Sequence, residues 1–365
     1  MNHPDAGVGA STVIDVPRRE QAFACASSET DAPWAISLTF GDRAESHVGM
    51  EMLGDAAPCG FTSDDLRTAA RHWEDMGVET ELIALHQGVE GAPEAHVLVA
   101  RDGARHLLHL AARESSDEVG VGVGVGVGVG VGVGVGVGVG AGVDGAGGDT
   151  AHCDELEALC TEQLAQDVDK VAWMHGRVVA KRARYNLCYA DTGQEPEYAK
   201  QRGRVVAFRD VPFLGKIRAA LPQVLGAKAA GLLCEMNLYY DPAKCGIRFH
   251  GDLERCMVVC VRLGTPIPLQ FRWFRHRQPV GGAIDISVGH GDVYVMSEKA
   301  VGTDAANTDI MTLKHAAGAP KFLKVTPPAP SEAPPPPPHT ALRHHDAWLD
   351  AWASKCMRGG GRGHA

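Results

Sequence analysis

The sequence predicts an α+β protein whose larger part is made of short β-strands. Its second half contains several apolar runs that are separated by Gly, Pro and charged residues. These runs are RVVAF, GLLCEMNLYY, GIRFH, CMVVCVRLG, LQFRWF, IDISV and DVYVM. Several short strands at this spacing are typical of a β-sandwich or barrel. A helix is expected just before them, over 153–171 (CDELEALCTEQLAQDVDKV).

Two low-complexity segments divide the chain. Residues 119–140 are eleven consecutive Val-Gly pairs, and residues 327–339 read PPAPSEAPPPPPH. Glycine at every second position makes ordering costly and leaves nothing large to pack, so we expect 116–150 to be a flexible linker. The proline-rich run is expected to be an extended spacer within a disordered tail, 327–365. A ligand for a proline-binding module is the alternative for this run.

The segment before the linker has the pattern of a small domain. It combines three strand-like runs, AISLTF, HVLVA and HLLHLAA, with one helical stretch, DDLRTAARHWEDM. We therefore expect a disordered N-terminus over 1–34, a small α+β domain over 35–115, and a larger domain over 151–326.

Composition narrows the class of protein. The ten cysteines are scattered and include no C-x-x-C pair, which is typical of reduced thiols in a nuclear or cytoplasmic protein. The long uncharged Val-Gly run is too rich in glycine to cross a membrane. The N-terminus, MNHPDAGVGASTVIDVPRRE, lacks the apolar core of a signal peptide. We expect a soluble monomer without a membrane partner.

Charge is distributed unevenly along the chain. Residues 171–326 contain 22 Lys and Arg against 13 Asp and Glu, although the whole chain has a net charge of −10. A basic domain in an acidic chain favours a polyanionic partner such as nucleic acid, and a merely solvated basic surface is the alternative. The run FRWFRHR (271–277) has the composition that stacks on bases. In a strand the same alternation puts aromatic residues in the core, which is the interpretation we favour.

The most informative motif is His250-Gly251-Asp252, an H-x-D sequence next to a strand-like run. In a strand, residues i and i+2 face the same side, so the imidazole and the carboxylate can converge on one metal ion. With one distant histidine they would form the 2-His-1-carboxylate triad of non-haem Fe(II) enzymes. The motif alone is weak, because a plain hydrogen-bonded His–Asp pair has the same sequence.

The surrounding residues resemble the AlkB/TET-like Fe(II)- and 2-oxoglutarate-dependent dioxygenases. Asn237-Leu238-Tyr239 looks like the N-x-Y that contacts 2-oxoglutarate in these enzymes. GHGDVYVM (289–296) looks like the strand that leads toward the distal histidine. MTLKHAAG (311–318) is similar to the last motif, in which a basic residue binds the co-substrate carboxylate.

Longer phrases are similar to a branch of this superfamily found in algae and large viruses. They are TFGDRAESHVGM (39–50), HGRVVAKRARYNLCYAD (175–191), FHGDLER (249–255) and DVYVMSEKAVGTD (292–304). The branch includes algal TET-like enzymes that modify 5-methylcytosine and take ascorbate in place of 2-oxoglutarate. The resemblance implies a double-stranded β-helix (jelly-roll) with flanking helices over 151–326.

The chain departs from the family pattern at two places. The window in which the distal histidine is expected reads VGTDAANTD (301–309) and contains none. His315 is then the first candidate for the third iron ligand, His290 is the second, and the lack of any third protein ligand is the remaining alternative. Thr308 and Lys314 stand where the family has its two arginines. Lysine lacks the rigid two-pronged donor of arginine, so 2-oxoglutarate binding is expected to be weaker.

The resemblance implies an Fe(II)-dependent dioxygenase that uses O2 with 2-oxoglutarate or ascorbate and oxidises methyl groups on nucleobases in DNA or RNA. The site residues it implies are His250, Asp252 and His315 for the metal and Asn237, Tyr239 and Lys314 for the co-substrate. Such an enzyme must extrude the methylated base from a duplex. The alternative hypothesis is a catalytically degenerate scaffold of the same fold that binds nucleic acid or a protein partner. An enzyme acting on protein side chains is a third.

Overall fold

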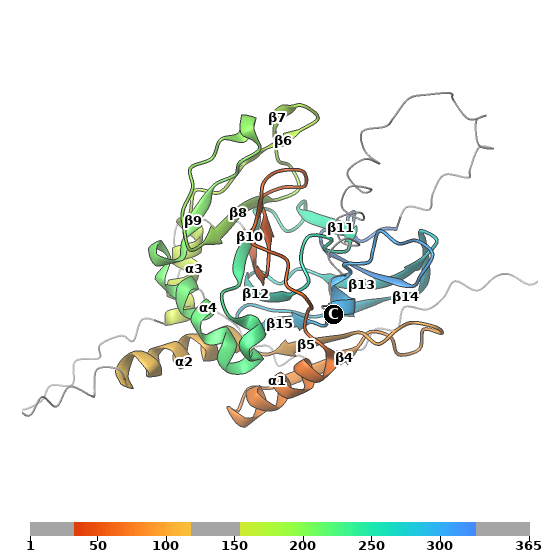
Figure 1. Cartoon of the computed structure of the whole chain (residues 1–365), viewed down its shortest axis with the longest axis horizontal. Coiled ribbons are helices and arrows are strands. Elements are labelled where there is room, and N and C mark those ends of the chain that lie inside the picture. Colours follow the sequence, from red (N-terminus) through yellow and green to blue (C-terminus); the bar gives the residue numbers. More distant parts are fainter. Residues whose placement is uncertain (1–32, 118–153, 326–365) are drawn as a thin grey trace, which may run out of the picture. The chain divides into compact units, whose positions relative to one another are not determined.

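The computed structural model describes residues 33–117 and 154–325, and all of them belong to one compact unit, Met1–Val325. Side chains are described over 33–111 and 154–325. The expected linker and Pro-rich tail lie outside these residues almost entirely, as does most of the expected disordered N-terminus, so those three predictions stay predictions. The described part is a mixed α+β structure, which confirms the predicted class (Figure 1).

The larger sheet has eight strands. Their order is β4 (Thr80–Ala84), β5 (His96–Ala100), β15 (Val293–Met296), β12 (Val258–Gly264), β1 (Ala35–Gly41), β10 (Leu233–Tyr239), β8 (Tyr185–Ala190) and β9 (Val205–Ala207). Neighbouring strands are antiparallel except for β8 and β9, which are parallel.

The second sheet has four antiparallel strands, in the order β11 (Gly246–His250), β16 (Thr312–Gly318), β13 (Leu269–Arg275) and β14 (Gln278–Ile286). Two short ribbons complete the described strands: β2 (Ala44–Glu45) with β3 (Met52–Leu53), and β6 (Val171–Met174) with β7 (Arg177–Ala180). Most apolar runs that predicted strands are strands in the structure.

Four of the five described helices cover one face of the large sheet, and the small sheet covers the other (Figure 1). The short helix α5 (Glu298–Val301) packs on the side of the small sheet. The helices are α1 (Ser63–Asp75), α2 (Gly103–Asp117), α3 (Glu155–Leu164), α4 (Pro212–Leu225) and α5 (Glu298–Val301), with 3-10 turns η2 (Tyr198–Lys200), η3 (Phe208–Asp210) and η4 (Ala227–Ala229). Helix α1 begins with a capping box, in which Thr62 and Asp65 satisfy each other's backbone N–H groups. No described helix is long and apolar enough to cross a membrane.

Strand β1 shows how the alternation of side chains along a strand gives the large sheet two different faces. Ile36, Leu38 and Phe40 are fully buried against the helices. The residues between them, including Ser37 and Thr39, point to the opposite face, toward the small sheet. Thus the large sheet is apolar on its helical face and carries polar groups on the face toward the small sheet.

The position of β1 corrects the predicted domain boundary. The strand lies between β10 and β12, in the middle of the large sheet, and β4 and β5 extend that sheet beyond β15. The segment 35–115 therefore does not form a domain of its own, because its strands have their hydrogen-bonding partners in the C-terminal half. Charge and composition could not indicate this pairing, because it joins strands that are far apart in the sequence.

Two local predictions were wrong. The run HLLHLAA, expected as a strand, lies in α2, where Ala104, Leu107, Leu108 and Ala111 are buried at helical spacing. The helix expected over 153–171 is shorter, because α3 ends at Leu164 and the chain continues into β6 at Val171.

A core substitution in β1 tests the central position of this strand. Leu38 is fully buried between the sheet and the helices. Leu38→Ala should lower the free energy of unfolding by about 2–5 kcal/mol, because it leaves a cavity in a packed core. Urea unfolding followed by circular dichroism measures this, with Val178→Ala, at a side chain that is 42% exposed, as the control. A negligible effect of Leu38→Ala would contradict a core role for β1.

Candidate metal centre

Two strands and one tight turn bring His250, Asp252 and His315 together. His250 is the last residue of β11, and it lies directly opposite His315 of the neighbouring strand β16. One ligand atom from each of the three side chains lies within 4.8 Å of the others. The Asp252 Oδ1 atom is 3.3 Å from His250 Nε2 and 3.4 Å from His315 Nε2. The sequence predicted this grouping, and among the three alternatives for the third ligand it is His315 that joins the pair.

Gly251 allows the turn between His250 and Asp252. A Cβ atom at this position would lie 2.2 Å from the carbonyl oxygen of Gly302 and 2.6 Å from the Cβ of Ala305. The Asp252 N–H donates to the carbonyl oxygen of Val301 at 3.0 Å. This hydrogen bond attaches the backbone of Asp252 to the same segment, which contains Gly302. Only glycine therefore fits at the middle position of the H-x-D motif, because a larger residue would clash with the neighbouring backbone.

The donor set fits a single metal ion. Two ligand atoms about 2.1 Å from one ion and at right angles to each other are about 3.0 Å apart, close to the two separations measured to Asp252 Oδ1. The Nδ1–H of His250 faces the carbonyl oxygens of Arg248 and His315 at 2.9 and 3.0 Å, which leaves Nε2 as the metal-binding atom. The buried Nδ1 of His315 has no hydrogen-bond partner among the described residues.

Burial and mutual contact set the protonation of the three groups. Burial alone would raise the pKa of Asp252, but contacts with His250 and His315 hold this pKa well below its usual range. Burial lowers the pKa of His315, and the neighbouring His250 lowers it further. Burial also opposes the charged form of His250, but Asp252 outweighs it and raises the pKa. An ionised acid beside a neutral His315 is the form in which these side chains bind a cation.

Arg255 is the centre of a buried ion-pair cluster that includes Asp252. Its side chain is 5% exposed, its Nη2 is 2.6 Å from Glu235 Oε2 and 2.8 Å from Glu254 Oε1, and its Nε is 3.6 Å from Asp252 Oδ2. Glu235 stands on the inward face of β10, so this arginine joins the metal-site turn to the large sheet. The sequence alone assigned no role to Arg255 or Glu235. The alternation of Glu235, Asn237 and Tyr239 along one strand was the signal that could have indicated Glu235.

The two residues predicted to contact the co-substrate from β10 are on the same inward face. The Asn237 side-chain oxygen accepts hydrogen bonds from Arg184 Nε and, at 2.6 Å, from Asn186 Nδ2. Its amide donates to Glu235 Oε1 at 3.2 Å, which links it to the metal site through Arg255. Tyr239 is 3% exposed and packs in the apolar cluster between the sheets.

Lys314 does not face the metal site, so its predicted role is wrong. It follows Leu313 and precedes His315 in β16, and both neighbours point into the space between the sheets. Because side chains alternate along a strand, Lys314 points to the outer face, where its Nζ lies 5.2 Å from the centre of the Phe274 ring. His290 also lies elsewhere: its Nδ1 accepts from the Gly264 N–H at 3.0 Å, and its Nε2 is 3.8 Å from Glu157.

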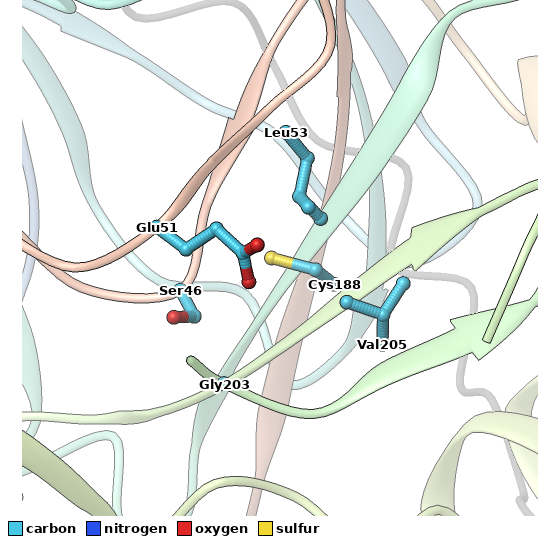
Figure 2. A pocket seen from close by; sticks show the side chains of 6 residues that line it. All are labelled: Ser46, Glu51, Leu53, Cys188, Gly203 and Val205. Carbon is cyan, nitrogen blue, oxygen red and sulfur yellow. The ribbon is translucent and has the colours of Figure 1, made fainter. Parts of the chain in front are cut away.

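A separate cavity lies near β8 and β9. It is lined by Ser46, Glu51, Leu53, Cys188, Gly203 and Val205, as Figure 2 shows. The space is too narrow to hold a water molecule. Burial raises the pKa of the Cys188 thiol, so it stays protonated and is a poor nucleophile. This cavity contains none of the metal-site residues and has the character of a packing gap.

Comparison with known proteins identifies a viral relative. The chain is 37% identical over 300 residues to an uncharacterized protein of Acanthamoeba polyphaga mimivirus, and the match covers 81% of this chain and 100% of the viral protein. No protein-family model matches the chain. The extent of the match places residues on both sides of the Val-Gly run within the similarity.

Gly251→Ala tests the tight turn. The added methyl group meets the backbone of Gly302, so we expect a loss of about 1–3 kcal/mol in the free energy of unfolding. Urea unfolding measures this. Gly282→Ala is the matched control, because a Cβ there meets nothing within 4 Å. Equal effects of the two substitutions would show that the turn is not constrained as described.

Arg255→Met tests the buried charge cluster. The substitution keeps much of the volume but leaves Glu235 and Asp252 without their cation, so the free energy of unfolding should fall by about 3–5 kcal/mol. Arg67→Met, which removes only exposed ion pairs with Asp64 and Glu94, should change it little. Chemical unfolding of both variants at pH 7 is the measurement, and a stable Arg255→Met protein would contradict the assigned role.

Proposed function

Since the chain belongs to the same family as the uncharacterized mimivirus protein, we propose its function from its own site: an Fe(II)-dependent dioxygenase that oxidises methyl groups on nucleobases in DNA or RNA. The observation that carries the proposal is the convergence of His250, Asp252 and His315. Two histidines and one carboxylate on one side of an ion leave its other positions open for small molecules.

The strand pairing supports a jelly-roll around this site. Strands β13 and β14 pair, β12 pairs with β15, and β11 pairs with β16, so that each pair encloses the previous one along the chain. The next strand outward, β10, pairs with β1. Eight strands in two antiparallel layers with this nesting are typical of a jelly-roll, and we propose that the N-terminal strand β1 is its last strand.

Exposure of the donors supports a site that ligands can enter. The side chain of His250 is 33% exposed, whereas those of Asp252 and His315 are each 9% exposed. Small molecules would therefore reach a bound ion from the His250 side. A bound Fe(II), with O2 and 2-oxoglutarate or ascorbate, supplies the chemistry that oxidises an unactivated methyl group. The chain itself holds the donors: Arg255 holds Asp252, and backbone carbonyls hold His250.

A cluster of aromatic and basic residues supports a nucleic-acid partner. The rings of Tyr185 and Tyr240 are stacked 4.5 Å apart, and Lys170 Nζ lies 5.9 Å from the centre of the Tyr185 ring. The Tyr240 hydroxyl donates to the carbonyl oxygen of Arg182, whose own side chain is exposed. Although burial opposes it, Asp252 raises the pKa of His250, and the charge of the neighbouring Arg184 opposes this rise as a smaller effect. Stackable rings beside cations suit a strand whose base enters the site.

The second candidate function is a scaffold without catalysis. The orientation of Lys314 favours it, because the residue at the family's co-substrate position does not face the metal site. Thr308, at the position of the other family arginine, belongs to a loop, where its carbonyl oxygen accepts from the His276 N–H. On this reading the protein binds nucleic acid or a partner and does not turn over a co-substrate.

Metal titration tests the site directly. The parent protein should bind Co(II), used as an oxygen-stable substitute for Fe(II), with the visible absorption of a His- and carboxylate-bound ion. Asp252→Asn and His315→Ala should each weaken this binding by at least about a hundredfold, since each removes one of three ligands. His290→Ala, outside the site, is the control. Binding that survives loss of Asp252 would contradict the proposed ligands.

Turnover separates the enzyme from the scaffold. The anaerobically Fe(II)-loaded protein is mixed with a methylated or an unmethylated oligonucleotide, O2, and either 2-oxoglutarate or ascorbate. We expect an oxidised base, detected by mass spectrometry of the nucleosides, only with the methylated strand and not with Asp252→Asn. Tight oligonucleotide binding without any oxidised product would instead support the scaffold. Product from methylated peptides alone would redirect the proposal to protein substrates.

A further inference from the structure

Arg262 is a buried cation without an acidic partner. It lies in β12 with 4% of its surface exposed, and it points to the inward face, away from the helices. Its Nε and Nη1 atoms have no hydrogen-bond partner among the described residues, and no described carboxylate lies within 4.0 Å of its guanidinium. Its side chain rests on the ring of Tyr294, 5.6 Å from the ring centre. Buried charged donors in this state are rare in folded proteins.

A second unsatisfied group lies beside it. Ser37 of β1 is directly opposite Arg262 in the strand register, and its buried hydroxyl also has no partner among the described residues. On the far side of β1, Ser37 is opposite Asn237 of β10. Register partners on neighbouring strands have side chains about 5 Å apart. One row across the large sheet therefore carries a guanidinium with two unpaired nitrogens and an unpaired hydroxyl, next to Asn237, whose amide is already hydrogen-bonded within the chain.

This row shares the space between the sheets with the metal site. Phe271 is opposite His315 in the strand register, and its ring centre is 5.7 Å from that of His315. The same apolar cluster contains Phe271, Tyr239 and Tyr294. Arg262 therefore contacts Tyr294, a member of the cluster against which His315 packs.

The contrast with Arg255 indicates what is missing. Both arginines are buried on the same side of the large sheet, but Arg255 has three carboxylates around it and Arg262 has none. The carboxylates beside Arg255 come from the chain itself, and only its Nη1 is without a partner among the described residues. A buried guanidinium with two unpaired nitrogens and no carboxylate is instead suited to a ligand anion, which it can bind with two parallel hydrogen bonds.

We propose that Arg262, with Ser37, binds the negatively charged group of a small organic anion that enters the space between the sheets as the co-substrate. This inference rests on the proposed dioxygenase function and takes the place of the co-substrate role first assigned to Lys314. The anion is a carboxylate, as in 2-oxoglutarate, or an enolate, as in ascorbate. Both present an oxygen anion to the guanidinium.

The experiment measures anion binding apart from turnover. The full chain, loaded with Co(II), is titrated calorimetrically and without O2 with 2-oxoglutarate, with ascorbate and with succinate. Parent protein should bind 2-oxoglutarate or ascorbate, and whichever binds identifies the source of the anion. Arg262→Met should weaken this binding at least about tenfold while leaving Co(II) binding intact, and Arg262→Lys should be intermediate. Arg275→Met, which removes an exposed charge from β13, should bind as the parent does.

The stability of Arg262→Met is a second measurement, and it distinguishes a ligand-binding arginine from one that stabilises the fold. Without ligand, Arg262→Met should unfold at the same urea concentration as the parent or at a higher one, because it removes an unpaired buried charge. Unchanged anion binding in Arg262→Met, or a large loss of its stability without ligand, would overturn the inference. If the parent binds Co(II) but no anion, the inference fails while the metal site stands. If it binds no Co(II), the proposed function fails, and anion binding by the metal-free chain decides the role of Arg262.

Discussion

The pairing of β11 with β16 is the constraint on which the metal site depends. It sets His315 opposite His250, and Gly251 then turns the chain so that Asp252 meets both. A slip of one residue in this pairing would turn His315 outward and bring Lys314 inward, because side chains alternate along a strand. The donor geometry is therefore held by the hydrogen-bonded backbone of a sheet, which is a firmer support than a loop. The turn is also constrained, because Gly251 packs so closely on Gly302 that no larger residue fits there.

The polar interior between the sheets is divided between two arginines with different surroundings. Arg255 ties Asp252 to Glu235 and so connects the metal-site turn with the large sheet. Arg262 lies on the same face, and the described chain gives its free N–H groups no acceptor. Opposite charges inside a protein stabilise it only when they compensate each other closely. The first arginine has three carboxylates within the described chain and keeps only Nη1 without a partner there, and the second receives its opposite charge from a ligand in the function we propose.

Local patterns in the sequence predicted most strands, helix α1 and the three metal-site residues. They succeeded where the deciding residues are close together in the chain, such as His250 and Asp252. They failed where a distant partner decided the outcome. Lys314 matched a motif, but the strand register turned it away from the site. The apolar run in α2 has both helical and strand-like spacing, and packing against α4 selected the helix. The domain boundary failed for the same reason, because the neighbours of β1 come from the far end of the chain.

The central place of β1 has a consequence for how the protein is made. Thr39 and Cys260, which touch across neighbouring strands, are 221 positions apart in the chain. During synthesis the first strand to leave the ribosome must wait, with its apolar residues exposed, until both β10 and β12 have followed. Contacts of such long range slow folding and prolong exposure to aggregation. An apolar strand near the N-terminus therefore stays unpaired until most of the chain has been synthesised.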